Sequence, residues 1–218
     1  MYDSVGAAVL PFQTAFEGRI EYLYLDVRGL VTIGVGNLID DARDAGNGDA
    51  TRGLAFARPL PFVWKTDDSA ADQDAIDQDW TAVKTRQDLA ARGAGAFASI
   101  TQLKLDDGHI DDLVRQKADE FEATLKRSAE FAGFDDMPAD AQLGLLSMAW
   151  AMGPAFAPKF PRFASACQDG RWGDAADQCH IAGPGLGRRN DADRMLFLNA
   201  AQVAADGGDY AELVYQVG

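Results

Sequence analysis

The chain has 218 residues, of which 47% are hydrophobic and 25% are charged, a composition typical of a soluble globular protein with one large domain or two small lobes. Its formal net charge of -14 argues against nucleic-acid binding, which relies on Lys and Arg to neutralise phosphates. The same charge provides no long-range attraction toward an anionic membrane or cell wall.

The N-terminal segment predicts an amphipathic helix and not a targeting signal. Hydrophobic residues recur there at helical spacing, at Val5, Val9, Phe12 and Phe16. The segment has neither the basic start nor the uniformly apolar run of a signal peptide, so we expect a protein made in the cytoplasm without one. Gly18 is a natural left-handed cap and predicts a helix end at Glu17, while Pro11 leaves open whether one helix or two precede it.

An antiparallel hairpin is predicted by two runs rich in aromatic and branched residues, Tyr22–Leu25 and Leu30–Ile33. Between these runs we expect the three-residue loop Val27–Gly29, in which Gly29 supplies the positive φ.

Two carboxyl groups and a hydroxyl group meet around this hairpin. The loop length pairs Tyr24 with Thr32, so that Asp26 becomes a diagonal neighbour of Thr32 on one face of the sheet. Glu17 lies at the negative end of the first helix, which disfavours the ionised carboxylate and suits a general acid, whereas Asp26 at a solvated turn is expected to stay ionised. Two carboxyl groups in different environments suit glycoside hydrolysis. Asp at the head of a turn is also a common turn former, so the residue types alone leave a structural role open.

The middle of the chain predicts a loop followed by a helix. Residues 40–53 form a polar stretch rich in Gly, Asp and Asn, which we interpret as a solvated surface loop. Its alternating acids invite a calcium site, but the spacing differs from that of an EF-hand loop and the terminal Glu is missing. The next helix is expected to be capped within residues 67–69 and to bury a face made of Ile76, Trp80 and Val83.

The second half of the chain is expected to be helical throughout. A long amphipathic helix is predicted over residues 110–125 and a core helix over residues 138–153. Short helices follow, broken at Gly170 and Gly173. The last two helices are expected at residues 189–205 and 210–217.

We therefore expect a mostly helical α+β fold without membrane insertion. Residues 1–108 would form an N-terminal mixed part that contains the hairpin, and residues 109–218 a helical C-terminal part.

The remaining reactive side chains indicate neither a metal site nor a cofactor site. Cys167 and Cys179 do not form a CxxC pair, so we expect buried free thiols, with a disulfide as the alternative in an oxidising compartment. His109 and His180 are isolated along the chain, and no HExxH, Walker or dinucleotide motif is present.

The run from Phe16 to Asn37 resembles the phage-type lysozyme (muramidase) family. It contains the family's Glu-Gly pair, a strand that ends in Tyr-x-Asp at Asp26, and the string Gly-Leu-Val-Thr-Ile-Gly-Val-Gly over residues 29–36, at the catalytic spacing of the family. Three later segments are similar to the family's core helix with its glycine break, to the helix after it and to its arginine motif: residues 148–153, 160–172 and 187–190.

The resemblance implies a two-lobed, lysozyme-like fold with a cleft between the lobes and a small antiparallel sheet in the N-terminal lobe. It implies a bacteriolytic, antimicrobial glycoside hydrolase that cleaves the β-1,4 bond between N-acetylmuramic acid and N-acetylglucosamine in peptidoglycan. By position, Glu17 would be the general acid, Asp26 the base or electrostatic partner, and Thr32 the residue that holds the water or the carboxylate.

The resemblance also implies three substrate-binding positions, namely Gly36, Trp150 and Arg189. Trp150 matches a sugar-stacking wall, although an aromatic residue in an apolar helix is more often part of the core. Arg189 matches the arginine that packs near the acid and is expected to pair with Glu17, whereas Arg188 is expected to be a surface charge.

Two departures from the family pattern affect these expectations. Asn37 replaces the histidine that is common after the second glycine, so a structural hydrogen bond is expected to differ. The segment of residues 40–108 is longer than in compact phage enzymes. We expect it to form an enlarged lobe or a cleft wall, with Trp64 as a candidate lining residue.

Two other functions stay open alongside the muramidase hypothesis. A lytic transglycosylase acts on the same polymer and needs mainly one Glu, so the presence of Asp26 and Thr32 disfavours it. A catalytically silent module that binds the wall or builds a phage tail is the other.

The strong acidity favours delivery to the periplasm or cell wall by a secretion apparatus or a lysis system. The expected partners are peptidoglycan glycan strands and an immunity protein that plugs the cleft of a secreted effector. We expect a monomer.

Overall fold

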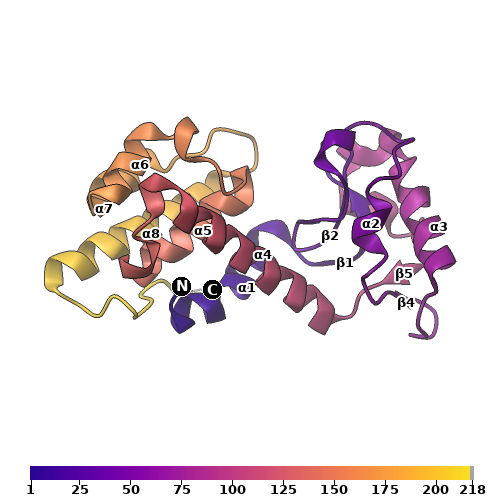
Figure 1. The fold of residues 1–218 in the computed structure, drawn as a ribbon, viewed down its shortest axis with the longest axis horizontal. Coiled ribbons are helices and arrows are strands. Elements are labelled where there is room, and N and C mark those ends of the chain that lie inside the picture. Colours follow the sequence, from indigo (N-terminus) through magenta and orange to yellow (C-terminus); the bar gives the residue numbers. More distant parts are fainter. Residues whose placement is uncertain (217–218) are drawn as a thin grey trace. The chain divides into compact units, whose positions relative to one another are not determined.

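The structure is a computed structural model and describes residues 1–216. Helices dominate the chain, and a small antiparallel sheet lies in its N-terminal part (Figure 1). The expected mostly helical α+β fold is confirmed at this level. The chain forms two compact units: one is Glu17–Val114, and the other joins Met1–Phe16 to the chain from Arg115 onward.

α1 (Asp3–Glu17) is one continuous helix that passes through Pro11. Its predicted hydrophobic face is buried, as at Val9 and Phe12. Gly18, with a φ of +74°, ends the helix where the sequence predicts, because glycine adopts this left-handed conformation without a steric penalty.

The start of α1 makes its polar contacts with the C-terminal part of the chain. Tyr2 N donates to Gln142 Oε1 at 3.0 Å, and Ser4 Oγ donates to Ala211 O at 2.6 Å. The observed division therefore differs from a boundary at residue 108: the first sixteen residues belong with the helical unit, and the boundary lies within α4 (Asp107–Arg127).

The unit Glu17–Val114 is built on a three-stranded antiparallel sheet. Its strands lie in the order β1 (Ile20–Leu25), β2 (Val31–Gly34) and β3 (Asn37–Leu38). The first two strands are the predicted hairpin, whereas β3 has only two residues and is too short to show a sequence pattern. Two helices of this unit are α2 (Leu54–Ala57) and α3 (Gln73–Lys84). α3 packs against β1 and β2.

The predicted apolar face of α3 is buried, but the helix begins later than the sequence suggests. The Asp72 side chain caps it by accepting a hydrogen bond from Ala75 N at 2.8 Å. Residues 67–69, which were the predicted caps, instead form a turn after the short strand β4 (Val63–Trp64). β4 pairs with β5 (Leu103–Lys104) in a second small sheet that no sequence pattern predicts.

The segment of residues 40–53 is irregular apart from one 3-10 turn, as predicted. Asp40 and Asp44 within it are nevertheless buried. Each forms an ion pair, Asp40 with Lys84 and Asp44 with Arg52. The interpretation as a solvated surface loop is therefore wrong for these two residues, because basic side chains further along the chain compensate their charges.

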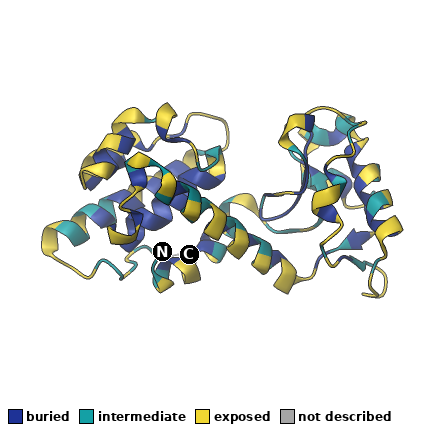
Figure 2. Ribbon diagram, in the orientation of Figure 1, coloured by how far each residue is buried: buried dark blue, intermediate teal, exposed yellow. Residues whose placement is uncertain are grey.

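The other unit is helical. After α4 it contains, in chain order, α5 (Ala139–Met152), α6 (Pro161–Gln168), α7 (Trp172–Gln178) and α8 (Gly187–Asp206). α5 is buried along almost its whole length and begins and ends where predicted, after Pro138 and before Gly153 (Figure 2). Gly144 permits close packing of α8, because a Cβ at this position would lie 2.7 Å from the Phe197 ring.

Two predictions near the C-terminus are wrong. Gly173 lies inside α7, so only Gly170 separates the two short helices there. The helix expected over residues 210–217 is absent from residues 210–216, and Val217 lies outside the described residues. Asp140 binds this end of the chain by accepting hydrogen bonds from backbone N–H groups, which holds it without helical structure. Within residues 1–216, no helix is long and apolar enough to cross a membrane.

Candidate functional site

Glu17 is the last residue of α1 and is exposed at the surface. Gly18 turns the chain out of the helix, and β1 begins at Ile20. Asp26 and Thr32 belong to the same compact unit as Glu17. The three predicted catalytic residues therefore fall within one unit, although the helix that Glu17 ends belongs otherwise to the helical unit.

The hairpin has the predicted register, in which Tyr24 pairs with Thr32. Gly29 has a φ of +73° in the turn. Asp26 N donates to Leu30 O at 2.9 Å, and Gly29 N donates to Asp26 O at 2.9 Å. The three-residue loop and its positive φ are both confirmed, and the register makes Asp26 a diagonal neighbour of Thr32.

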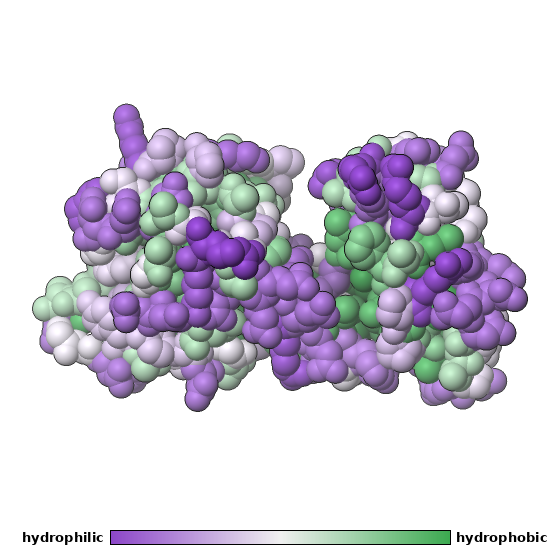
Figure 3. Space-filling model, viewed as in Figure 1, coloured by the Kyte–Doolittle hydropathy of each residue, from purple (hydrophilic) through white to green (hydrophobic). Residues whose placement is uncertain are grey.

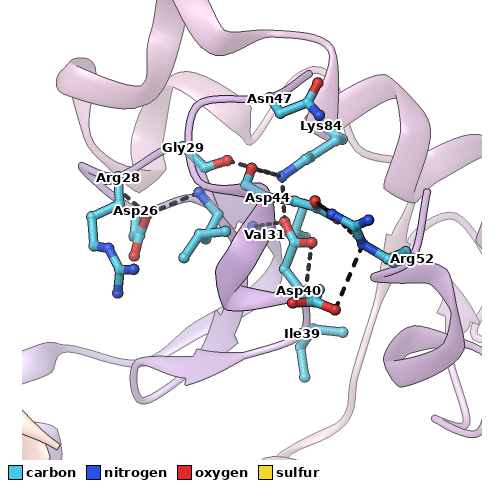
Figure 4. A network of polar contacts seen from close by, with 12 residues as sticks. Asp26, Arg28, Gly29, Val31, Ile39, Asp40, Asp44, Asn47, Arg52 and Lys84 are labelled. Carbon is cyan, nitrogen blue, oxygen red and sulfur yellow. Dashed lines mark hydrogen bonds and ion pairs between the residues drawn. The ribbon is translucent and has the colours of Figure 1, made fainter. Parts of the chain in front are cut away.

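The side chains of Asp26 and Thr32 both bond the backbone of this turn. Asp26 Oδ1 accepts hydrogen bonds from Arg28 N at 2.8 Å and from Leu30 N at 2.9 Å (Figure 4). Thr32 is 5% exposed, and its Oγ1 donates to Leu30 O at 3.1 Å. The Thr32 hydroxyl therefore donates its proton to the turn backbone. The lone pairs of its oxygen can still accept a hydrogen bond from a ligand.

Tyr24 is a neighbour of the trio that sequence reasoning missed. Burial raises the pKa of its phenol, and the negative charges of Glu17 and then Asp26 raise it further. Both carboxylates therefore lie within electrostatic reach of one phenol, which stays protonated. The sequence could have indicated that Tyr24 lies near the trio, because the predicted register already pairs Tyr24 with Thr32.

Gly36 lies in the tight turn between β2 and β3 and has a φ of +70°. Asn37, which replaces the histidine of the family pattern, stabilises this turn: its Oδ1 accepts from Val35 N at 3.1 Å. Its Nδ2 donates to Leu113 O in α4 at 3.0 Å. Asn37 therefore acts as a structural bridge within the unit.

Arg189 is buried in the helical unit, on α8. Its Nη1 donates to Gln13 Oε1 and to Ser147 Oγ, both at 2.9 Å. Its guanidinium lies 4.8 Å from the centre of the Phe16 ring, the residue that precedes Glu17 in the chain. The expected pairing with Glu17 stays a prediction. Arg188 is exposed, as expected of a surface charge.

A second missed residue, Asp193, lies one helical turn after Arg189. Both of its carboxylate oxygens are buried and lack a hydrogen-bond partner among residues 1–216. Burial raises the pKa of Asp193 to about 7, although the Ser147 hydroxyl and the Arg189 charge oppose the rise. The spacing from Arg189 was visible in the sequence, but the burial was not.

Trp150 offers little surface to a ligand. It is 8% exposed and packs edge-on against Phe121, with ring centres 5.7 Å apart. The ammonium group of Lys117 lies 4.1 Å from the centre of its ring. These contacts favour a core role over the predicted sugar-stacking role.

The remaining candidates are one tryptophan, two histidines and two cysteines. Trp64 is half-buried, and both histidines are exposed. Cys167 and Cys179 are buried free thiols, and burial raises the pKa of both. Within residues 1–216, no group of three or more His, Cys, Asp or Glu side chains is arranged to hold a metal ion.

Hydrophobic side chains gather on one face of the unit that contains the trio, next to strongly hydrophilic ones (Figure 3). Exposed large hydrophobic residues of this unit are Val27, Leu38 and Phe56. Val27 is 88% exposed in the turn next to Asp26. Two hollows of about 440 and 450 Å³ lie on the helical unit, and none of the predicted site residues lines them.

Neither the comparison with protein-family models nor the search of curated proteins finds a match to this chain. Its function is therefore inferred from the geometry of its residues and from the resemblance of the segment that ends at Asn37.

Proposed function

We propose that the chain is a peptidoglycan hydrolase of the muramidase type, which cleaves the β-1,4 bond between N-acetylmuramic acid and N-acetylglucosamine. The observation that carries the proposal is the hairpin geometry: the pairing of Tyr24 with Thr32 makes Asp26 a diagonal neighbour of Thr32, and the chain turns at Gly18 from Glu17 into the first strand of the same hairpin. The resemblance of residues 16–37 to phage-type lysozymes supports the same conclusion, and with it a two-lobed, lysozyme-like arrangement.

In the proposed reaction, the Glu17 carboxyl donates its proton to the glycosidic oxygen as the bond from the sugar C1 to that oxygen breaks. Asp26 stabilises the positive charge that develops on the sugar, or takes a proton from the attacking water. The water oxygen bonds to C1, and the proton that it loses returns to the Glu17 carboxylate, directly or by way of Asp26, so that one water molecule is consumed for each bond cleaved. Thr32 accepts a hydrogen bond from this water.

Three residues outside the trio have proposed roles in binding the substrate. Gly36 would bring turn backbone close to the sugar, because a glycine has no side chain to obstruct it. Arg189 would hold Glu17 in place, as the family resemblance implies, and its bonds to Gln13 and Ser147 fix its own position within the helical unit. Trp150 would stack on a sugar only through the small part of its ring that Lys117 and Phe121 leave exposed.

We further propose that the chain acts in the periplasm or cell wall as a monomer. Its net charge of -14 would slow an approach to an anionic wall by diffusion, so delivery by a secretion apparatus or lysis system is favoured. An immunity protein that blocks the site would protect the producing cell.

The test is hydrolysis of purified sacculi by the wild type and by Glu17→Gln. We expect the variant to lose at least about 100-fold in rate, since a positioned general acid contributes roughly this much or more, and to melt at nearly the same temperature because Glu17 is exposed. Glu21→Gln, which changes another exposed carboxyl of the same unit, is the control and should retain activity.

Two further variants separate the roles within the trio. Asp26→Asn should be severely impaired, whereas Thr32→Ser should retain part of the activity because the hydroxyl group is kept. Mass spectrometry of the products distinguishes a hydrolase from a lytic transglycosylase, which releases anhydro-sugars. Wild-type protein that binds sacculi but releases no fragments would refute the enzymatic proposal in favour of a silent wall-binding module.

A further inference from the structure

A fully buried ion pair lies directly behind the turn of the catalytic hairpin. Lys84 Nζ is 2.6 Å from Asp40 Oδ2, and both side chains are 0% exposed (Figure 4). Lys84 is the last residue of α3, and Asp40 comes two residues after β3. Both belong to the long segment of residues 40–108 to which the family resemblance assigns no role.

The two charged groups bond the hairpin backbone at adjacent peptide groups. Lys84 Nζ donates to Gly29 O at 3.3 Å, and Gln87 Nε2 donates to the same oxygen at 3.1 Å. Asp40 Oδ2 accepts from Val31 N at 2.9 Å. The turn is therefore held by a donor at one peptide group and by an acceptor at the next.

The same two peptide groups orient the proposed catalytic side chains. The peptide group between Gly29 and Leu30 presents its carbonyl to Lys84 and its N–H to Asp26 Oδ1. Since a peptide group is planar, fixing its carbonyl fixes the direction of its N–H. A bond from Lys84 thus determines where the Asp26 carboxylate is held.

In the next peptide group, between Leu30 and Val31, the N–H faces the buried ion pair and the carbonyl faces the proposed catalytic side chain. Its N–H donates to Asp40, and its carbonyl accepts from Thr32 Oγ1. Asp40 thereby orients the group that holds the Thr32 hydroxyl.

We propose that the buried pair of Lys84 and Asp40 positions Asp26 and Thr32 for catalysis, and that this is a function of the long segment 40–108. The inference rests on the proposed muramidase activity. Lys84 and Asp40 are positioning residues, because they act through the turn backbone and do not touch the substrate. A buried ion pair is a weak source of stability compared with hydrophobic packing, so its place behind this turn is better explained by the geometry it imposes.

The experiment compares the wild type with the double variant Lys84→Met/Asp40→Asn, which removes both buried charges together and leaves neither unpaired. The substrate is a soluble glycan strand of alternating N-acetylglucosamine and N-acetylmuramic acid. We expect kcat to fall by about 10- to 100-fold with KM changed less than about threefold, because a small misplacement of a catalytic group lowers the rate more than binding.

Amide hydrogen exchange gives a readout that a general loss of stability does not reproduce. In the double variant we expect the Leu30 amide, which bonds Asp26, to exchange at least about tenfold faster. The buried Ile76 amide in α3, which bonds Asp72 O at 3.1 Å, should be unchanged. A matched control is Arg58→Gln/Asp77→Asn, which removes an ion pair from the exposed side of the same helix and should leave kcat unchanged.

Gln87→Ala is the second variant, in case the double variant does not fold. It removes one of the two side-chain donors to Gly29 O without exposing a buried charge, and we expect kcat to fall by about three- to tenfold with faster exchange at Leu30. An active enzyme whose kcat and Leu30 exchange are unchanged in these variants would overturn the positioning role alone. An inactive wild type would instead refute the proposed function, and the catalytic role of the pair with it.

Discussion

A carboxyl group without a hydrogen-bond partner among residues 1–216 lies inside the helical unit at Asp193. Ser147 on α5 and Arg189 on the same helix lie near it. Gln13 on α1 accepts a hydrogen bond from this arginine through Oε1, and its Nε2 is likewise without a partner in this part of the chain. The negative charge of Asp193 adds to the burial that raises the pKa of Tyr215. Since the pKa of Asp193 is raised to about 7, this carboxyl changes its charge near neutral pH.

The pH dependence of stability follows from this shift. An unfolded Asp titrates at about 3.9, so between about pH 4 and pH 7 the folded state holds a proton that the unfolded state has lost. The contribution of Asp193 to the free energy of unfolding is therefore fully present below about pH 4 and is lost as the pH rises to about 7.

We expect Asp193→Asn to remove this loss. Relative to the wild type, the variant should gain about 2 to 4 kcal/mol in free energy of unfolding between pH 4 and pH 8, since one pKa unit corresponds to about 1.4 kcal/mol. Urea denaturation across this range measures the difference. Asp191→Asn, at an exposed position of the same helix, is the control and should show no comparable trend. A pH-independent difference for Asp193→Asn would contradict the assignment.

At the scale of secondary-structure elements, two glycines have almost the same positive φ and different surroundings. Gly18 at the end of α1 has a φ of +74°, and a Cβ there would meet nothing within 4 Å beyond its chain neighbours. Gly29 in the hairpin turn has a φ of +73°, and a Cβ there would collide with the side-chain oxygen of Gln87. The helix end thus needs glycine for its backbone alone, and the turn needs it for space as well.

This difference predicts the cost of alanine at each position. Gly18→Ala should lower the free energy of unfolding by about 1 to 2 kcal/mol, the usual penalty of a left-handed conformation. Gly29→Ala should cost about 1 kcal/mol more, because Gln87 must leave its bond to the turn. In the background of Gln87→Ala, the cost at Gly29 should fall to that at Gly18. Urea denaturation measures these costs, and equal values for the two single variants would show that Gln87 does not restrict the turn.

For the whole molecule, the net charge of -14 causes electrostatic repulsion from an anionic polymer. Salt shortens the range of this repulsion, from about 30 Å at 0.01 M to about 8 Å at 0.15 M ionic strength. The proposed delivery by a secretion or lysis system places the enzyme next to its substrate and so avoids a slow approach through solution.

We therefore expect the hydrolysis of sacculi to accelerate several-fold when ionic strength rises from about 0.01 M to about 0.15 M. Cleavage of a short soluble glycan fragment, which carries few charges, should change much less under the same conditions. Turbidity loss of sacculi and chromatography of the fragment provide the two rates. A decrease on sacculi alone would indicate that local basic contacts outweigh the net repulsion.

The local features of the site could be predicted from the sequence. The helix end before Gly18, the three-residue turn with Gly29 and the pairing of Tyr24 with Thr32 all follow from interactions between residues close in the chain. The two ends of the core helix, after Pro138 and before Gly153, could be predicted as well. Pro and Gly restrict or free the backbone at their own positions, which needs no distant contact.

Only the tertiary structure decided which polar residues are buried and what compensates them. The sequence around Asp40 predicts a solvated loop. The structure shows that Asp40 is buried against Lys84, which lies more than forty residues later in the chain. Asp193 has the sequence context of an ordinary helix residue, and only the packing of α8 against its neighbours shows that it is buried. Burial depends on contacts between distant segments, which composition and periodicity do not specify. The sequence by itself therefore determined the turn, the register and the candidate residues of the hairpin, and the tertiary structure determined what holds that hairpin in place.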